Sequence, residues 1–358
     1  MDMDLEPRTS QLMAEAEGGG YYTWSSSKFP LLAKTNVAAG YLVLRPGGFA
    51  LPHYADSSKV GCVLQGTDGV VGMVLPNTRK EVVLKLKKGD VLPVPLGTAS
   101  WWFNKGDSDL IISFLGETSK AQIPGQFSYF LLAGTQGLMG GFSTEVTSKA
   151  YNLSKEDTEK LTKSQKGVLI IKLPRDQPMP IPQMDKTKEL VYNIDAANPD
   201  NVVKNGGLIT TVTEEEFPFV GQVGVSVIRV KLEPNAIKVP VYPANTAIQL
   251  IYIARGNGKI EIVGLNGERE LDTEVNAGHL LVVPQFFVLA VIAGGEGIEY
   301  YSMVTTKKPV FEELAGNFSI WEAISPKVQQ VALNVDEEFQ KLFLSKIRNT
   351  TDLIPPKN

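Results

Sequence analysis

Short apolar runs separated by turn-forming residues make up most of the 358-residue chain. Runs such as Val37–Leu44, Val60–Leu64 and Leu110–Phe114 are bounded by Gly, Pro, Asn and Asp. A second set extends from Val223–Leu232 to Ile298–Val304. Many short runs at turn-punctuated spacing are typical of the strands of β-sandwiches and barrels. The pattern therefore predicts a fold dominated by β-structure.

Helical spacing follows each set of strands. In Tyr151–Ser164, Ser154 precedes Asp157 by three residues, which is a helix-start signal. In Ser319–Ile347, Ser319 and Asn334 each have a glutamate three residues later, in capping-box spacing. We therefore expect a short helical arm after each strand set.

The two strand sets form an internal repeat. Gly66 and Gly256 close matching hairpins, and the spacing of Gly89 to Pro95 recurs at Gly278 and Pro284. The sequence therefore predicts two tandem β-barrels, called below the first barrel and the second barrel.

The expected domains are residues 1–175 and 185–358, each a barrel plus its arm. The linker Leu173–Lys188 contains four prolines, which favour an extended segment without regular structure.

Composition excludes several classes of function. The net charge of -4 gives no electrostatic footprint for nucleic acid, and no apolar run is long enough to span a membrane. A single cysteine, Cys62, cannot form an internal disulfide. The first residues are acidic rather than basic and apolar, so we expect a cytoplasmic protein.

Two motifs identify the barrels. The first barrel carries the spacing Gly-x5-His followed by Gly, and then a second segment of Gly-x5-Pro-x-Gly ending in Asn. The first segment comprises Gly47, His53, Ala55, Lys59 and Gly66, and the second comprises Gly89, Pro95, Gly97, Ser100 and Asn104. This framework resembles the cupin superfamily, whose motifs place three His and one Glu inside a jelly-roll barrel as metal ligands.

The ligand positions of those motifs are largely replaced. Only His53 matches, while Ala55, Lys59 and Ser100 stand where the resemblance implies His, Glu and His. A lysine repels a divalent cation, so we expect no metal and no cofactor. In the second barrel the corresponding residues are Val241, Gln249 and Leu289.

Longer stretches narrow the resemblance. Pro-Gly-Gln-Phe-Ser-Tyr-Phe-Leu-Leu-Ala-Gly at 124–134, Val-Pro-Gln-Phe-Phe-Val at 283–288 and Leu-Ala-Gly-Asn-Phe-Ser at 314–319 are similar to legumin-type (11S) seed globulins, including glutelins. The resemblance implies a bicupin that stores nutrients without catalytic residues. It also implies a self-assembled homotrimer, or a hexamer of two stacked rings, joined through the arms.

Three features of that family are missing from the sequence. We expect no secretory signal, and the paired cysteines are reduced to Cys62. The acidic variable segment is missing, and Asn205-Gly206 is not followed by the acidic residues that complete a processing site. The chain thus resembles the short, unprocessed, glutelin-like bicupins of plants.

An alternative function remains open on the sequence alone. His53 and Lys59 could act as acid, base or amine nucleophile in a metal-independent isomerase, lyase or cyclase acting on a plant metabolite. Ser100, Trp102 and Asn104 are then the candidate ligand-binding residues of the first barrel, with Asn104 at its rim. Against this, Lys59 could extend to a wet barrel mouth and His53 could be a relic bonded to its neighbours.

Overall fold

The computed structural model describes residues 3–174 and 176–356, in two compact units. The first barrel comprises Ser10–Ala196 together with Phe217–Val223, and the second comprises Ala197–Glu216, Gly224 onwards and the N-terminal segment up to Thr9. The expected boundary at residue 175 lies outside the described residues. The two units therefore exchange short segments rather than meeting at one point in the chain.

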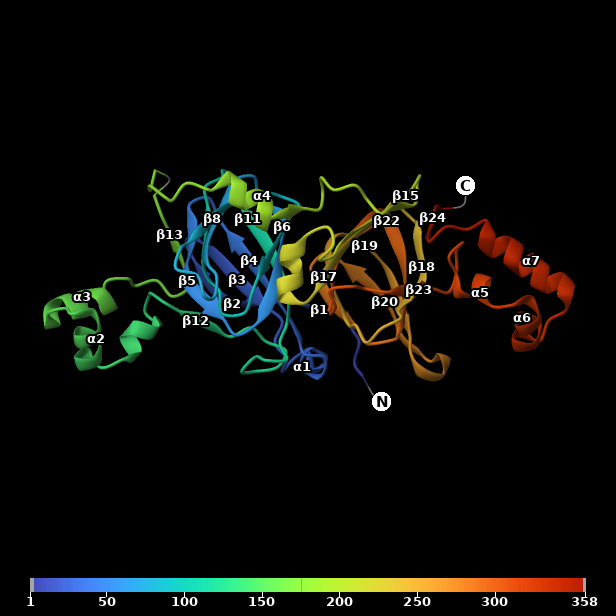
Figure 1. Ribbon diagram of the computed structural model, residues 1–358, viewed down its shortest axis with the longest axis horizontal. Helices are drawn as coiled ribbons and strands as arrows, with labels where there is room; N and C mark the ends of the chain where they lie inside the picture. Colours follow the sequence, from blue (N-terminus) through green and yellow to red (C-terminus); the bar gives the residue numbers. More distant parts are fainter. Residues whose placement is uncertain (1–2, 175, 357–358) are drawn as a thin grey trace. The chain divides into compact units, whose positions relative to one another are not determined.

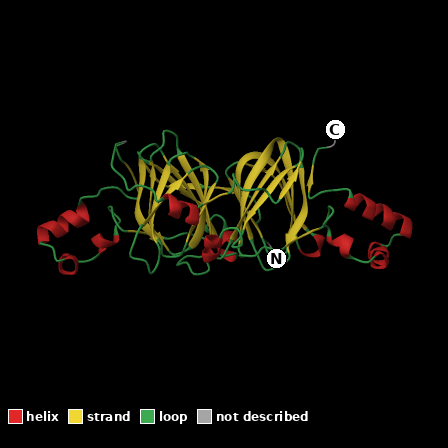
Figure 2. Ribbon diagram, turned by 45° about the horizontal axis from the view of Figure 1, so that its top comes forward, coloured by secondary structure: helices red, strands yellow, loops and turns green. Residues whose placement is uncertain are grey.

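The first barrel is a jelly roll of two facing antiparallel sheets (Figures 1 and 2). The seven-stranded sheet runs in the order β14 (Tyr192–Asn193), β9 (Asp90–Val94), β6 (Ser58–Gln65), β11 (Leu110–Glu117), β4 (Val37–Leu44), β3 (Gly19–Thr23) and β2 (Gln11–Ala16). The six-stranded sheet runs β12 (Tyr129–Leu131), β5 (Gly48–Ala55), β10 (Ala99–Asn104), β7 (Gly69–Val74) and β8 (Val82–Leu86), with β13 (Ile170–Lys172) also on β5.

The second barrel repeats this plan within one eleven-stranded sheet. Its path is β1 (Arg8–Thr9), β21 (His279–Val283), β19 (Gln249–Val263), β22 (Val288–Val304), β17 (Ser226–Leu232), β16 (Gly207–Val212) and β15 (Asn201–Val203). Off the path lie β18 (Ile237–Pro243), β20 (Arg269–Asn276), β23 (Phe311–Glu313) and β24 (Leu353–Ile354). The long strands β19 and β22 pair with register shifts near Gly256 and Gly258, where the sheet bends.

Strand register confirms the duplication. His53 pairs with Ser100 in the first barrel, and Val241 pairs with Leu289 in the second. A register shift follows next to each pair, so the repeat extends to local irregularities of the backbone.

Both arms are helical, with boundaries that differ from the expected ones. The first arm has η1 (Leu138–Gly141), α2 (Thr144–Tyr151) and α3 (Lys155–Lys163), because Asn152 adopts a left-handed conformation that ends α2. Ser154 caps α3 through the amide of Asp157, as predicted.

The second arm contains α5 (Ile320–Ala323), α6 (Pro326–Leu333) and α7 (Glu337–Arg348) (Figure 1). Ser319 caps α5 as expected, but Asn334 ends α6 in a left-handed conformation, and the cap of α7 is Asp336. The sequence identified the right segment and assigned the wrong cap.

Four smaller elements were not predicted. The proline-rich linker carries α4 (Met184–Leu190), which packs on β8, and α1 (Pro30–Lys34) precedes β4. β1 pairs with β21 of the second barrel, and η2 (Pro218–Val223) packs on β9 of the first. No helix in the described ranges is long and apolar enough to cross a membrane.

Candidate functional site

The interior of the first barrel holds a small cavity of about 20 Å³. Both sheets contribute to it, and its lining residues are Tyr21, Leu42, Ala50, His53, Lys59, Trp102, Phe114, Tyr129 and Leu169. One water molecule needs about 10–15 Å³ measured in this way, so the cavity has room for one water-sized occupant.

Lys59 is buried in this interior, with only 3% of its surface exposed. Its Nζ lies 4.4 Å from the ring centre of Tyr129, 5.0 Å from that of Phe127 and 5.4 Å from that of Phe114. It also donates to the Tyr129 hydroxyl at 3.3 Å. The expectation that Lys59 extends to a wet mouth is therefore wrong, because its ammonium group sits in an aromatic cage.

The cage changes the titration of Lys59. Burial lowers the pKa of Lys59 to about 7, and the partly buried carboxylate of Asp56 only partly opposes this shift. The aromatic faces and the Tyr129 hydroxyl favour the ammonium form, whereas the loss of water favours the neutral amine. Near neutral pH both forms are therefore accessible.

His53 lies next to Lys59 and is bonded locally, as the relic interpretation expects. Its Nδ1 is 2.7 Å from the carbonyl oxygen of Leu51, an acceptor, so Nδ1 carries the hydrogen and Nε2 is left as an acceptor. Burial and the positive charge of Lys59 lower the pKa of His53 to about 4, against the bond to Leu51. His53 is therefore neutral at neutral pH.

Two tyrosines complete the site and were missed by the sequence reasoning. The hydroxyl groups of Tyr21 and Tyr129 are 2.5 Å apart, and burial raises the pKa of both. Tyr21 comes from β3 and Tyr129 from β12, outside the two motifs. Tyr129 lies in the 124–134 stretch that carried the family resemblance, but nothing in that stretch indicated an inward side chain.

The three candidate ligand-binding residues are all buried, with different roles. Trp102 lines the cavity, and its Nε1 donates to Ser100 Oγ at 3.2 Å. Asn104 does not lie in the cavity: its Nδ2 donates to the carbonyl oxygens of Leu44 and Ser108 at 2.7 and 2.8 Å, and its Oδ1 accepts from Gly106 N. Asn104 thus holds the turn between β10 and β11.

The residues at the motif positions do not fit the metal that cupin motifs imply. His53 could offer only its Nε2, while Ala55 and Ser100 replace two histidines and a lysine stands where an acidic ligand is needed. Across the described ranges, no group of three or more His, Cys, Asp or Glu side chains is placed to hold a metal ion.

The second barrel has a different interior. Gln249 pairs with Val283, and Lys59 pairs with Val94; because each valine directly precedes the proline of the second motif, the two positions are equivalent. Its Oε1 accepts weakly from Ser302 at 3.4 Å, and its buried Nε2 has no partner among the described residues.

Charged groups in that barrel stand at other positions around the interior. Lys238 on β18 interacts electrostatically with Asp352 and Glu313. Burial lowers the pKa of Lys238, and the two carboxylates partly oppose this shift. These positions match Ala50, Leu169 and Leu131 of the first barrel by strand register, so the motifs gave no signal for them.

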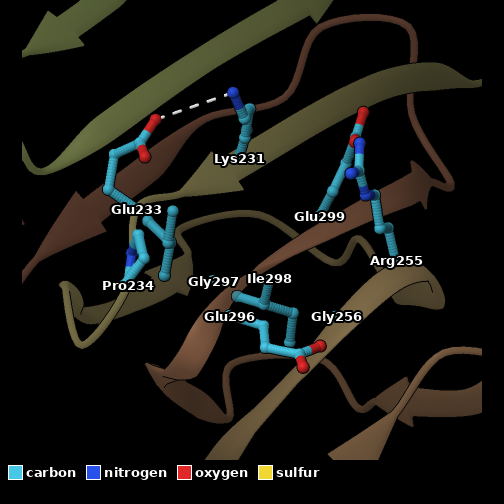
Figure 3. A pocket seen from close by; sticks show the side chains of 10 residues that line it. Lys231, Glu233, Pro234, Arg255, Gly256, Glu296, Gly297, Ile298 and Glu299 are labelled. Carbon is cyan, nitrogen blue, oxygen red and sulfur yellow. Dashed lines mark ion pairs between the residues drawn. The ribbon is translucent and has the colours of Figure 1, made fainter.

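A larger hollow, of about 240 Å³, lies beside the end of β17 and the middle of β19 and β22 (Figure 3). Lys231 pairs there with Glu233 at 3.6 Å, and Glu299 pairs with Arg229 at 2.7 Å. These four charges compensate one another, and the lining also contains one more charge of each sign, Arg255 and Glu296.

Comparisons with known proteins agree with this architecture. The family model described as Cupin matches residues 6–159 and 192–341. The chain is 26% identical to the coconut (Cocos nucifera) protein Cocosin 1, over 88% of this chain and 79% of that one. It is also 26% identical to the 12S seed storage protein CRB of Arabidopsis thaliana, over 97% and 89%.

Solved structures show the same fold. The pumpkin seed globulin superposes with a TM-score of 0.91 at 24% identity, over 99% of both chains. The coconut allergen cocosin gives 0.89 at 24% identity, again over 99% of both.

The chain therefore belongs to the cupin family, with one cupin domain in each half. It is a bicupin, and over most of its length it is similar to seed globulins of the 11S type, as the resemblance predicted.

Proposed function

We propose that this chain is a non-catalytic nutrient reservoir of the seed storage globulin type. The observation that carries the proposal is the filled interior of the first barrel. At its motif positions, Lys59 lies in an aromatic cage, His53 is bonded to Leu51 and Ser100 accepts from Trp102. The cavity beside them has room for one water-sized occupant. The relatives of the chain include two that are described as seed storage proteins, the 12S seed storage protein CRB of Arabidopsis thaliana and the 11S globulin seed storage protein 2 of Sesamum indicum.

The alternative function is disfavoured by size. A substrate for an isomerase, lyase or cyclase needs a pocket of about 300–1,000 Å³, whereas the cavity beside His53 and Lys59 has about 20 Å³. The 11S globulin of Wrightia tinctoria is described as revealing an auxin binding site. A ring system of that kind has no room in the first barrel of this chain.

Self-assembly through the arms is part of the proposal. In the second arm Trp321 packs edge-on against Phe343, and buried Gln329 is bonded to Gln340, so the helices are held together within the chain. The arm nevertheless exposes apolar side chains: Val328, Val331, Phe339 and Leu342. A pre-folded arm with an exposed apolar face supports assembly into a homotrimer.

Accumulation and consumption test the storage role. Quantitative mass spectrometry of maturing and germinating seeds should show the protein rising during maturation and falling after germination. A constant, low level in vegetative tissue would contradict the proposal. Light scattering of the purified protein should give three chain masses, and a single chain mass would contradict the assembly.

The cytoplasm is the location we propose. Burial raises the pKa of the Cys62 thiol to about 12, and the fold contains no disulfide that an oxidising compartment would have to form. A fluorescent fusion at the C-terminus should give a diffuse cytoplasmic signal, and a vacuolar signal would contradict the proposal.

A further inference from the structure

The charge of Lys59 lacks an opposite charge in contact with it. Within the described residues no carboxylate lies within 4.0 Å of Nζ, and its hydrogen bond goes to Tyr129. An ammonium group has three N–H donors, so two remain. A buried ammonium group without a counter-charge is costly, even with aromatic rings around it.

The cavity lies against the polar atoms that could bind an anion. Lys59 offers its unused N–H donors, and the hydroxyl pair of Tyr21 and Tyr129 has one hydrogen beyond the bond between them. None of the lining residues, all in the described part of the chain, carries a carboxylate. The site is thus cationic when Lys59 is protonated, and donor-rich on that side.

Volume restricts the occupant to a small ion. The cavity of about 20 Å³ is slightly larger than one water molecule requires. A carboxylate, phosphate or sulfate group contains several heavy atoms and does not fit, whereas a single-atom halide does.

We propose that the first barrel binds one small monovalent anion of the halide class, such as chloride, together with a proton on Lys59. The pair formed is neutral overall, so the burial cost of the ammonium group falls when the anion enters. The anion site is separate from the storage role and does not depend on it.

Neighbouring groups leave Lys59 as the group that titrates with the anion. His53 is neutral above its pKa of about 4, and the raised pKa values of Tyr21 and Tyr129 keep both phenols protonated. Asp56 acts in the same direction as the anion, since its charge favours the ammonium form. Binding should therefore be strong at pH 6 and lost by pH 9.

The second barrel provides a matched internal control. Gln249 stands in the place of Lys59, and Ser302 takes the place of Phe114 in the strand register. A neutral amide carries no charge for an anion to compensate, and Lys238 of the same barrel already interacts with the carboxylates of Asp352 and Glu313, so we expect no halide there.

Thermal unfolding tests the proposal in solution, with sodium chloride and sodium gluconate compared at equal ionic strength. At pH 6, chloride at roughly five times its dissociation constant should raise the midpoint of the first barrel by about 2–4 °C over gluconate, and at pH 9 the difference should vanish. Lys59→Met should abolish the chloride effect, whereas Gln249→Met should retain it. A chloride effect that is absent, or unchanged in Lys59→Met, overturns the proposal.

Crystals of the unsubstituted protein grown in bromide give a test that needs no variant. An anomalous peak beside Lys59 Nζ at pH 6, and none at Gln249, supports the site. Density that refines as a water only, without anomalous signal, overturns it.

Discussion

Lys59 and Gln249 occupy the same position in the two barrels, each paired with the valine directly before the proline of the second motif. In one barrel the side chain is a cation in an aromatic cage, and in the other it is an amide with an unpartnered Nε2. One duplicated framework thus carries two different interiors. The framework depends on glycines and turns, whereas the interior depends on side chains that can be exchanged without changing the strand register.

Stability should depend on pH through Lys59. Its pKa is lowered from 10.5 to about 7 in the folded protein, so between these values the unfolded chain binds more protons than the folded one. The free energy of unfolding should therefore rise with pH across this window, by at most about 1.4 kcal/mol per pH unit from this group. Urea unfolding of the parent and Lys59→Met at pH 7 and pH 9.5, in gluconate, measures the contribution.

From pH 7 to pH 9.5, the free energy of unfolding of the parent should increase relative to that of Lys59→Met. The exposed Lys120→Met variant, as control, should follow the parent at both values. Equal pH dependence in the parent and Lys59→Met would show that Lys59 keeps its ordinary pKa. The window stops below pH 10 because the raised pKa of the buried tyrosines adds an opposite slope above it.

The sequence predicted the duplicated framework because that framework uses local rules. Gly66 and Gly256 both adopt positive φ, a need that leaves a visible signal at one position. The prediction that they close matching hairpins is wrong, because Gly66 follows β6, which pairs with β9 and β11, and Gly256 lies within β19 beside a register shift. The cavity was only half predicted. His53 and Lys59 lie on motif strands, but Tyr21 and Tyr129 are brought to them by β3 and β12 from distant parts of the chain.

The exchange of segments between the units was not predictable either. β1 is two residues long, and its pairing with β21 joins Arg8 to Leu280. So short a strand shows no hydrophobic periodicity. Its pairing depends on the edge of a sheet that is formed by residues far along the chain.

Replacing Asn104 should affect stability and not anion binding. Asn104→Ala removes the hydrogen-bond partner of the carbonyl groups of Leu44 and Ser108 and of the Gly106 amide. Each buried group left unpaired should cost roughly 1–3 kcal/mol of stability. We expect a lower unfolding midpoint of the first barrel with the chloride effect intact. Loss of the chloride effect in a folded variant would place Asn104 in the anion site instead.

Charging the second arm should dissociate the assembly. Val331 is 82% exposed in the single chain, so Val331→Glu should leave its fold intact and place a carboxylate in the apolar interface. Analytical ultracentrifugation should show the dissociation constant raised by about tenfold or more, with Lys327→Gln as a neutral control. An unchanged trimer would show that this face is not the interface.

The N-terminal segment should stabilise the second barrel. Leu5 is only 2% exposed, and β1 covers the edge of β21. Leu5→Ala should cost about 2–5 kcal/mol and speed hydrogen exchange at His279–Val283, whereas exposed Leu12→Ala should change neither. Exchange that stays unchanged at β21 would show that the segment contributes nothing to that edge.

The bond between Asn205 and Gly206 should resist an asparagine-specific endopeptidase in the folded protein. Asn205 is exposed but has φ of 62° in the turn between β15 and β16, and Gly206 N donates to Val203 O at 2.9 Å. Cleavage needs an extended segment, and opening this turn would break the pairing of Val203 with Gly207. Digestion followed by intact-mass measurement should return a single uncut chain, while urea-unfolded protein should be cut at Asn205. Rapid cutting of the folded chain would show that the turn opens and that this bond can be cleaved in the native protein.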